Sequence, residues 1–234
     1  MSKVKRAHMV SRGYLKPWSA GQNRVEVIDI EKRKGFTTAI GNATVVNYAY
    51  ESGILRNDLE GEFQKVESAG IPNLVKLRAG HALDKEEKRK TVDFLDMHLS
   101  RGRFANQVEV LTPALVLRAD KDPETLLLKL GDRFLLSQYE KETLRLPELQ
   151  LEDCPWVITE TRGLITGDGA VLLWHREKGG PVATVSFPLS PTQLLVIGEP
   201  LAISGTQYLN DRVGVCSRRW LVGSIGSLNL EWAK

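Results

Sequence analysis

Two glutamates seven residues apart, Glu60 and Glu67, are the first side chains whose type and spacing suggest chemistry. Seven residues make nearly two turns of an α-helix, so both carboxylates would lean from one face. A histidine, His8, stands near the start of the chain, and an aspartate, Asp168, stands between two glycines much later. If these four side chains converge, one imidazole and three carboxylates would suit Mg²⁺ or Mn²⁺ and the hydrolysis of a phosphodiester.

Each of these candidate catalytic residues also has a simpler structural interpretation. Glu60 would lie near a helix N-terminus, where the helix dipole favours a carboxylate. Glu67 could pair with a nearby arginine, Arg6 or Arg101. His8 could donate to a backbone carbonyl and hold the start of the chain against the core. An aspartate in a Gly-Asp-Gly turn commonly bonds its own backbone. No local metal-ligand spacing decides between the two interpretations.

The first 16 residues form a basic arm with five basic side chains and no acidic one. Together with two arginines of a later helix, this arm could contact phosphate groups. A solvated terminus that keeps the protein soluble is the simpler explanation. The candidates for binding a nucleic acid or another partner are Lys5, Arg6, Arg12, Arg101 and Arg103.

The elements that must position these residues begin with two strands. Residues 23–35 alternate apolar and polar side chains before a turn at Lys34-Gly35, and residues 43–50 are rich in β-branched and aromatic residues. We expect the two strands to pair as a small sheet near the N-terminus.

The middle of the chain, about residues 57–150, is predicted to be helical. Apolar residues at helical spacing indicate a helix from Asp58 to about Ala69, which Pro72 interrupts. A capping box of Asp84 and Glu87 starts the next helix, which should run to about Phe104. A third helical region is predicted after Pro123, with an apolar stripe of Leu126, Leu127, Leu130, Phe134 and Leu135.

The rest of the chain changes character. Residues 155–200 contain four short β-type runs separated by turns, and a last helix is predicted at about residues 206–222, closed by Arg218, Arg219 and Trp220. The order β, mostly α, β, then α is typical of an α+β fold. We expect a single domain over residues 1–234, in which a central helical bundle packs on short, mostly antiparallel sheet elements from both ends of the chain.

Composition places the chain among ordinary globular proteins. Hydrophobic residues make up 42% and charged residues 26%, and the net charge is +3. No apolar run approaches the roughly 20 residues of a membrane span, and we find no secretory signal, so we expect a cytoplasmic protein with no membrane partner. Two distant cysteines, Cys154 and Cys216, are expected to be free thiols.

Several short motifs resemble a bacterial and phage family known only as a domain of unknown function. The family opens with His-x-x-Pro-x-x-Tyr-Leu-x-x-Phe, and this chain has His8, Ser11, Tyr14, Leu15 and Trp18 at those places. The family's two helical glutamates resemble Glu60 and Glu67, and its arginine-ended helix resembles FLDMHLSRGRF. Its Thr-Ser-Asp-x-Pro-Val is similar to residues 166–171, Pro-Leu-Ser-Pro is intact at 188–191, and a late Leu-Asn pair matches 209–210.

The resemblance spans the chain from His8 to about Trp220. The chain departs from the family at Ser11 for proline, Gly167 for serine and Ala170 for proline, and keeps His8 and Asp168. The resemblance implies an α+β domain and carries no known activity.

Two hypotheses about function remain open. One is a non-catalytic interaction protein that acts in bacterium–phage conflict by binding a host or phage protein or a nucleic acid through an exposed apolar or basic patch. The other is a metal-assisted nucleic-acid hydrolase, with Mg²⁺ or Mn²⁺ held by His8, Glu60, Glu67 and Asp168. The sequence predicts no other cofactor.

Overall fold

The computed structural model describes residues 6–47, 49, 54, 58–119, 121–140, 143–202 and 205–232. Lys5 and two residues of the predicted strand at 43–50, Tyr48 and Tyr50, therefore lie outside the described residues. Within the described part of the chain, no helix is long and apolar enough to cross a membrane.

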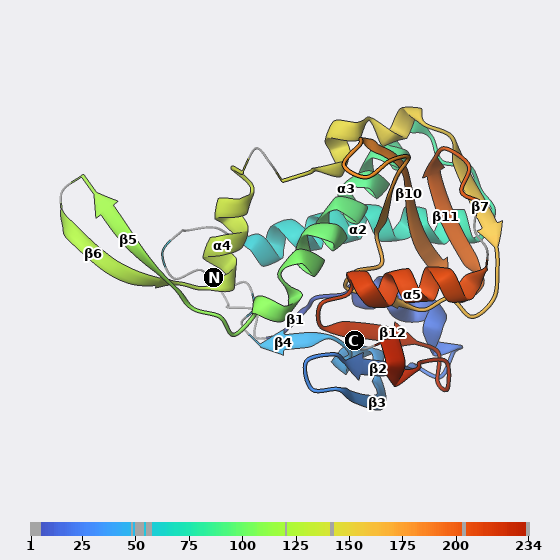
Figure 1. Ribbon diagram of the computed structural model, residues 1–234, viewed down its shortest axis with the longest axis horizontal. Helices are drawn as coiled ribbons and strands as arrows, with labels where there is room; N and C mark the ends of the chain where they lie inside the picture. Colours follow the sequence, from blue (N-terminus) through green and yellow to red (C-terminus); the bar gives the residue numbers. More distant parts are fainter. Residues whose placement is uncertain are drawn as a thin grey trace.

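Helices and antiparallel strands alternate along the chain (Figure 1). The helices are α1 Arg12–Leu15, α2 Leu59–Arg78, α3 Lys85–Arg103, α4 Leu130–Ser137 and α5 Thr206–Cys216. The strands are β1 Arg6–His8, β2 Arg24–Asp29, β3 Lys34–Ala39, β4 Val45–Asn47, β5 Thr112–Arg118, β6 Lys121–Leu128, β7 Trp156–Glu160, β8 Thr166–Gly167, β9 Leu172–His175, β10 Val182–Ser190, β11 Gln193–Gly198 and β12 Trp220–Gly223. Short 3-10 turns cover Lys16–Ser19, Ile40–Asn42, Ala105–Gln107, Leu146–Leu149, Leu151–Asp153 and Leu230–Trp232.

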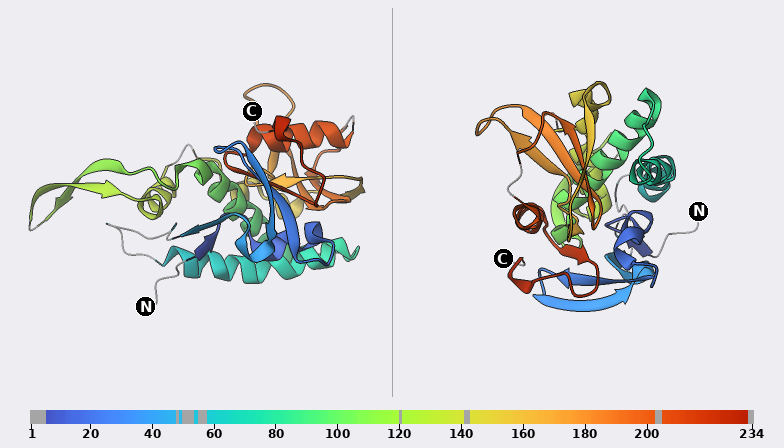
Figure 2. Two further views of the ribbon diagram at one scale, coloured as in Figure 1. Left: turned by 90° about the horizontal axis from the view of Figure 1, so that it is seen from below. Right: turned by 90° about the vertical axis from the view of Figure 1, so that its right-hand side faces the viewer.

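The strands form antiparallel sheets, which confirms the predicted α+β class. One sheet has the order β7-β11-β10-β9, from the predicted β-rich part of the chain. A second has the order β3-β2-β12-β8, so strands from the two ends of the chain lie side by side. The long helices α2 and α3 pack against each other and lie beside both sheets (Figures 1 and 2).

The N-terminal strands pair differently from the prediction. The strand at 23–35 exists as β2, but the chain turns at residues 30–33, and Gly35 lies inside β3. β2 pairs with β3 and β12, whereas β4 pairs with β1. The two edges of β2 are occupied by β3, which follows it directly, and by β12 from the end of the chain. The expected pairing of the two predicted strands is therefore wrong.

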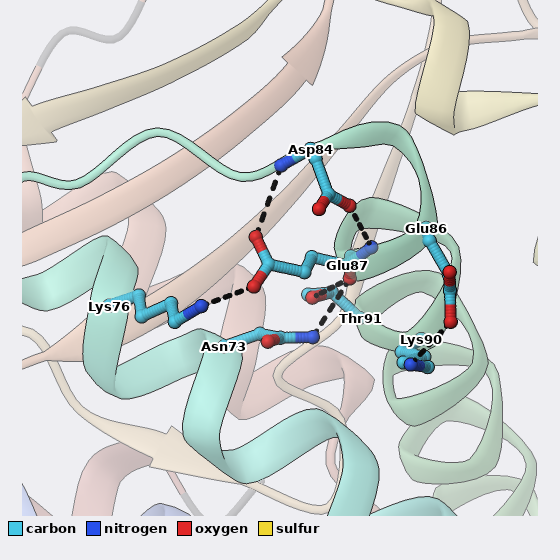
Figure 3. Close-up of polar contacts among 7 residues, drawn as sticks. All are labelled: Asn73, Lys76, Asp84, Glu86, Glu87, Lys90 and Thr91. Atoms are coloured by element: carbon cyan, nitrogen blue, oxygen red, sulfur yellow. Dashed lines mark hydrogen bonds and ion pairs between the residues drawn. The ribbon is translucent and has the colours of Figure 1, made fainter.

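The junction of α2 and α3 follows the local sequence signals closely (Figure 3). The Asp84 side chain accepts from the Glu87 amide at 2.8 Å, and the Glu87 side chain accepts from the Asp84 amide at 3.1 Å. Lys76 of α2 pairs with Glu87, and Asn73 donates to the Glu87 carbonyl at 2.9 Å. The predicted capping box is confirmed, and the same glutamate also ties the two helices together.

Pro72 does not interrupt α2, contrary to the prediction. The helix continues from Leu59 to Arg78 with Pro72 inside it. Proline removes one backbone donor and crowds the preceding turn, which disfavours a helix interior. Here Pro72 is exposed, while Leu74 and Leu77 beyond it are buried. Burial of apolar side chains before and after Pro72 therefore offsets the cost of the proline, and the helix remains continuous.

The third predicted helical region is only partly helical. Residues 121–128, with Leu126 and Leu127, form strand β6, which pairs with β5 in a hairpin. The helix α4 starts at Leu130 and buries Phe134 and Leu135, and Leu146–Leu149 is a 3-10 turn. The prediction failed because a short apolar run fits both helical and strand periodicity.

The last helix is also shorter than predicted. It ends at Cys216, and Trp220 belongs to strand β12. Arg218, Arg219 and Trp220 therefore do not close a helix, as the sequence suggested. The backbone amides of these three residues instead donate hydrogen bonds to the carboxylate of Asp168. The helix therefore ends before them, and the chain continues into the sheet.

The predicted basic arm contributes to the core. Tyr14, Leu15 and Trp18 are fully or almost fully buried. The Tyr14 ring stacks on Phe187 of β10, with ring centroids 4.7 Å apart, and meets Phe94 of α3 edge to face. In its described part, from Arg6 onward, this segment is therefore an integral part of the fold, while its basic side chains Arg6, Arg12 and Lys16 are exposed.

Candidate functional site

His8 lies on the short strand β1, where its backbone is paired with Val45 of β4. Its ring is partly buried, and burial lowers its pKa, whereas a hydrogen bond to the Gly41 backbone and the charge of Glu67 oppose that shift. Within the described part of the chain, the buried Nε2 atom has no hydrogen-bond partner. His8 therefore has one buried ring nitrogen that no described residue binds, and an imidazole nitrogen of this kind can act as a base or a metal ligand.

The two predicted glutamates lie on α2 beside Arg101 of α3. Glu67 Oε1 accepts from Arg101 Nη1 at 2.6 Å, and this guanidinium packs over the Phe63 ring at 4.3 Å from its centroid. Glu60 is near the helix start, and its buried Oε2 has no hydrogen-bond partner among the described residues. Burial raises the pKa of Glu60, the Arg101 charge lowers it, and the Glu67 charge raises it again.

Three of the four candidate catalytic residues are thus electrostatically coupled, because Glu67 acts on both His8 and Glu60. Over the described ranges, no three His, Cys, Asp or Glu side chains lie close enough to hold one metal ion. We name His8, Glu60, Glu67 and Arg101 the imidazole–carboxyl cluster.

Asp168 has a different set of partners. Its carboxylate accepts from the amides of Arg218 and Arg219 at 2.9 Å and from Trp220 at 3.4 Å. The side chain is buried, and burial raises its pKa to about 7 although the three amide hydrogen bonds lower it. None of these partners belongs to the imidazole–carboxyl cluster. Asp168 holds the start of β12 in place, which is the structural role that the sequence left open.

The described candidate basic residues differ in their contacts and in their exposure. Arg6 bonds Asn42 at 2.7 Å, and Arg101 is 97% buried at its side chain against Glu67 and Phe63. Arg103 donates to the Leu144 carbonyl at 2.9 Å, and Arg12 is exposed on α1. Arg6, Arg101 and Arg103 are therefore engaged in separate local contacts, whereas Arg12 is exposed.

Three strongly exposed leucines lie on the β5–β6 hairpin, which projects away from the body of the molecule (Figures 1 and 2). Leu115 is 66% exposed, Leu117 is 72% exposed and Leu127 is 51% exposed. They lie on one face, because Leu127 pairs with Pro113 and successive odd-numbered residues of β5 share that face. The sequence prediction missed this surface, although the alternation in TPALVLR was a signal for a strand.

The opposite face of the hairpin also carries apolar side chains. These are Ala114, Val116, Leu126 and Leu128, all only partly buried, and they share this face with Thr112 and Glu124. An isolated two-stranded hairpin is marginally stable in water. A hairpin that carries apolar side chains on both faces therefore resembles a protein-binding element more than a solvated loop.

Residues 6–210 match a family described as "Protein of unknown function (DUF4238)". The chain belongs to this family. Searches among curated proteins and among solved structures found no match. Membership in DUF4238 confirms the resemblance to a family of unknown function and assigns no activity.

Tyr14, Trp18, Thr166 and Pro188, which lie in the short motifs described above, belong to a buried network that joins distant parts of the chain. The Tyr14 hydroxyl donates to the Pro188 carbonyl at 2.7 Å and lies 2.7 Å from the Thr166 hydroxyl. The Trp18 indole donates to the Leu164 carbonyl at 2.9 Å. Such buried hydrogen bonds satisfy polar groups that folding removes from water. These motif positions therefore serve the fold, in contrast to the uncommitted atoms of His8 and Glu60.

Proposed function

We propose that this member of DUF4238 is an interaction protein that inserts its β5–β6 hairpin into an apolar groove of a partner protein. What supports the proposal is the exposure of leucines on one hairpin face together with apolar side chains on the opposite face. A flat partner surface would cover only one face, whereas a groove removes both from water. Burial of a leucine side chain contributes about 1.5–3 kcal/mol, so a few such residues can support specific binding.

A protein fits this surface better than a nucleic acid does. The residues from Leu111 to Leu117 carry no charge, and at the hairpin tip Arg118 is already paired with Glu124. Nucleic-acid binding requires cationic side chains along the phosphate backbone. The setting that we propose is conflict between a bacterium and a phage, with a host or phage protein as partner, and this rests on the family resemblance alone.

Replacement of Leu115 and Leu117 by serine is expected to abolish partner binding and leave the fold intact. Both side chains are already exposed in the folded chain, so their loss changes few internal contacts. Removal of two buried leucines from the complex should weaken binding more than about a hundredfold. The measurement is photo-crosslinking in the native cell with a benzoylphenylalanine placed at Leu127, followed by mass spectrometry of the adduct.

A matched control is Val75→Ser, which removes an apolar side chain that is 54% exposed on α2. The adduct should persist in this variant and disappear in the double hairpin variant. The proposal would be contradicted if benzoylphenylalanine at Leu127 crosslinked to no single protein. It would also be contradicted if the same protein were crosslinked equally in the double hairpin variant and in Val75→Ser. An adduct that contains only a second copy of this chain would mean that the hairpin mediates self-association instead of binding to a different protein.

Metal-assisted hydrolysis of a nucleic acid is a second candidate function. It is favoured by the buried His8 Nε2 and Glu60 Oε2 atoms, which have no partner among the described residues. Mg²⁺ or Mn²⁺ could draw these atoms together, since both ions accept carboxylate ligands and Mn²⁺ also accepts imidazole. Because the Asp168 carboxylate is occupied by backbone amides, His8, Glu60 and Glu67 would have to supply the protein ligands, and they would have to move closer together to do so, since no three such side chains of the described residues are placed to hold one ion.

Calorimetric titration with Mn²⁺ tests this second candidate. Wild-type protein should bind one ion, and Glu60→Gln should weaken binding at least about tenfold because the amide carries no charge. Glu62→Gln is the control, since Glu62 lies on the same helix, is exposed and pairs with Lys65. Absence of saturable Mn²⁺ binding, or equal binding by both variants, would rule out this function.

A further inference from the structure

Two clefts meet at a pair of arginines, Arg103 and Arg218. The smaller cleft, of about 430 Å³, lies between the C-terminal ends of α3 and α5 and the turn at residues 168–169. The larger, of about 540 Å³, lies beside α2, α3 and α4. Both arginines line both clefts. The smaller cleft has an otherwise largely apolar lining, which includes Leu99, Val171, Leu173 and Val215.

Close backbone packing brings the two arginines to this place. A side chain at Gly102 would overlap the carbonyl oxygen of Asp168, and one at Gly169 would overlap the backbone of Cys216. The glycines thus let α3, the turn and the end of α5 touch. Asp168 then binds the amide of Arg218 at 2.9 Å. Arg103 and Arg218 lie next to these contacts in the chain, so the tight packing fixes the positions of their backbones.

The pair carries positive charge that the described residues do not neutralise. Arg103 Nη2 donates to the Leu144 carbonyl, but its buried Nη1 has no partner. The Arg218 guanidinium makes no hydrogen bond or ion pair in the described part of the chain. Burial lowers the pKa of Arg103, the nearby Asp96 raises it, and the charges of Arg145 and Arg218 lower it.

The carboxylates around the clefts do not supply a partner. Asp96 is engaged by Arg145 at 2.6 Å and by the Leu146 amide at 2.8 Å. Glu62, Asp93 and Glu140 line only the larger cleft. The one carboxylate that lines the smaller cleft is Asp168, whose oxygens are occupied by amides. An anion is therefore favoured at the arginine end of the smaller cleft.

We propose that the smaller cleft binds an amphipathic anion whose carboxylate, sulfonate or phosphate head lies between Arg103 and Arg218. Its apolar body would lie along Leu99, Val171 and Leu173. The volume of the cleft falls within the range of small-molecule sites, and an apolar wall with few convergent polar groups is typical of them. Guanidinium groups suit oxyanions because they donate two parallel hydrogen bonds. This site does not depend on the hairpin or on a protein partner.

Calorimetric titration with decanoate tests the proposal on the intact protein. One decanoate should bind per chain, and Arg218→Gln should weaken binding about tenfold, which corresponds to loss of one charge-assisted contact. Arg162→Gln is the matched control, because Arg162 is also exposed but lines neither cleft. Arg162→Gln should bind decanoate as wild type does.

Two further measurements locate the ligand and its head group. Val215→Asp places a carboxylate at the cleft edge, where Val215 is 73% exposed, and should also weaken decanoate binding. Decan-1-ol, which has the same chain without the charge, should bind less tightly than decanoate. Equal affinity of Arg218→Gln and Arg162→Gln, equal binding of the alcohol, or no saturable binding by wild type would each overturn the proposal. Loss of binding in Leu115→Ser/Leu117→Ser would instead place decanoate on the hairpin and also overturn it.

Discussion

Gly102→Ala is expected to prevent folding or to lower the melting temperature by about 10 °C. An added Cβ at Gly102 would overlap the backbone carbonyl oxygen of Asp168, which cannot rotate away as a side chain can. Alanine favours a helix over glycine by only about 1 kcal/mol, whereas overpacking against rigid atoms costs about 3 kcal/mol or more. For a chain of this size, about 3 kcal/mol corresponds to roughly 10 °C. Thermal unfolding followed by circular dichroism measures the effect.

Gly41→Ala is the control for this prediction. A Cβ at Gly41 would have no heavy atom within 4 Å. This variant should melt at or slightly above the wild-type temperature, because alanine reduces the freedom of the unfolded chain. If Gly102→Ala melts with the wild type, the backbone at the C-terminal end of α3 does not pack on the Asp168 turn.

Local signals explain what the sequence predicted well. The capping box of Asp84 and Glu87 sets the start of α3 through hydrogen bonds within four residues, so no distant contact is needed to predict it. The β-type runs between Trp156 and Gly198 are strands because their apolar residues pair with neighbours in the same part of the chain.

Elements that depend on distant partners were predicted poorly. The end of α5 is set by Asp168, about 50 residues earlier in the chain, which binds three amides after Cys216. β4 pairs with β1 rather than β2, and the helix period of Leu126, Leu130 and Phe134 concealed a strand that ends at Leu128. The periodicity of apolar residues within one segment gives no information about contacts with distant segments.

In the candidate site, too, features set by local spacing were predicted, whereas features set by distant contacts were not. The seven-residue spacing of Glu60 and Glu67 correctly placed both on one helix, and Arg101 was among the possible partners of Glu67. The sequence could not show that Asp168 binds the backbone amides of residues 218–220, because this depends on how β12 returns to the sheet. The exposure of the hairpin leucines likewise depends on the absence of a covering element among the described residues.

Asp168→Ala is expected to destabilise the protein by about 3–5 kcal/mol, because two buried amides and one partly buried amide lose their acceptor. Each unsatisfied buried donor costs about 1–3 kcal/mol, and the removed carboxyl also leaves a void. The affected amides belong to Arg218, Arg219 and Trp220, which lead into β12 between β2 and β8. Urea unfolding measures the free energy, and amide exchange at Trp220 should become faster in the variant.

The control for this prediction is Asp153→Ala, which removes an exposed aspartate paired with Lys85. Exposed ion pairs contribute little, so this variant should unfold with the wild type. Asp168→Asn separates charge from shape: its amide group keeps the volume but turns one acceptor into a donor that faces backbone N–H groups. It should therefore lose much of the stability that Asp168→Ala loses. Wild-type stability in both Asp168 variants would mean that the carboxylate does not hold β12, and its position would then need a functional explanation.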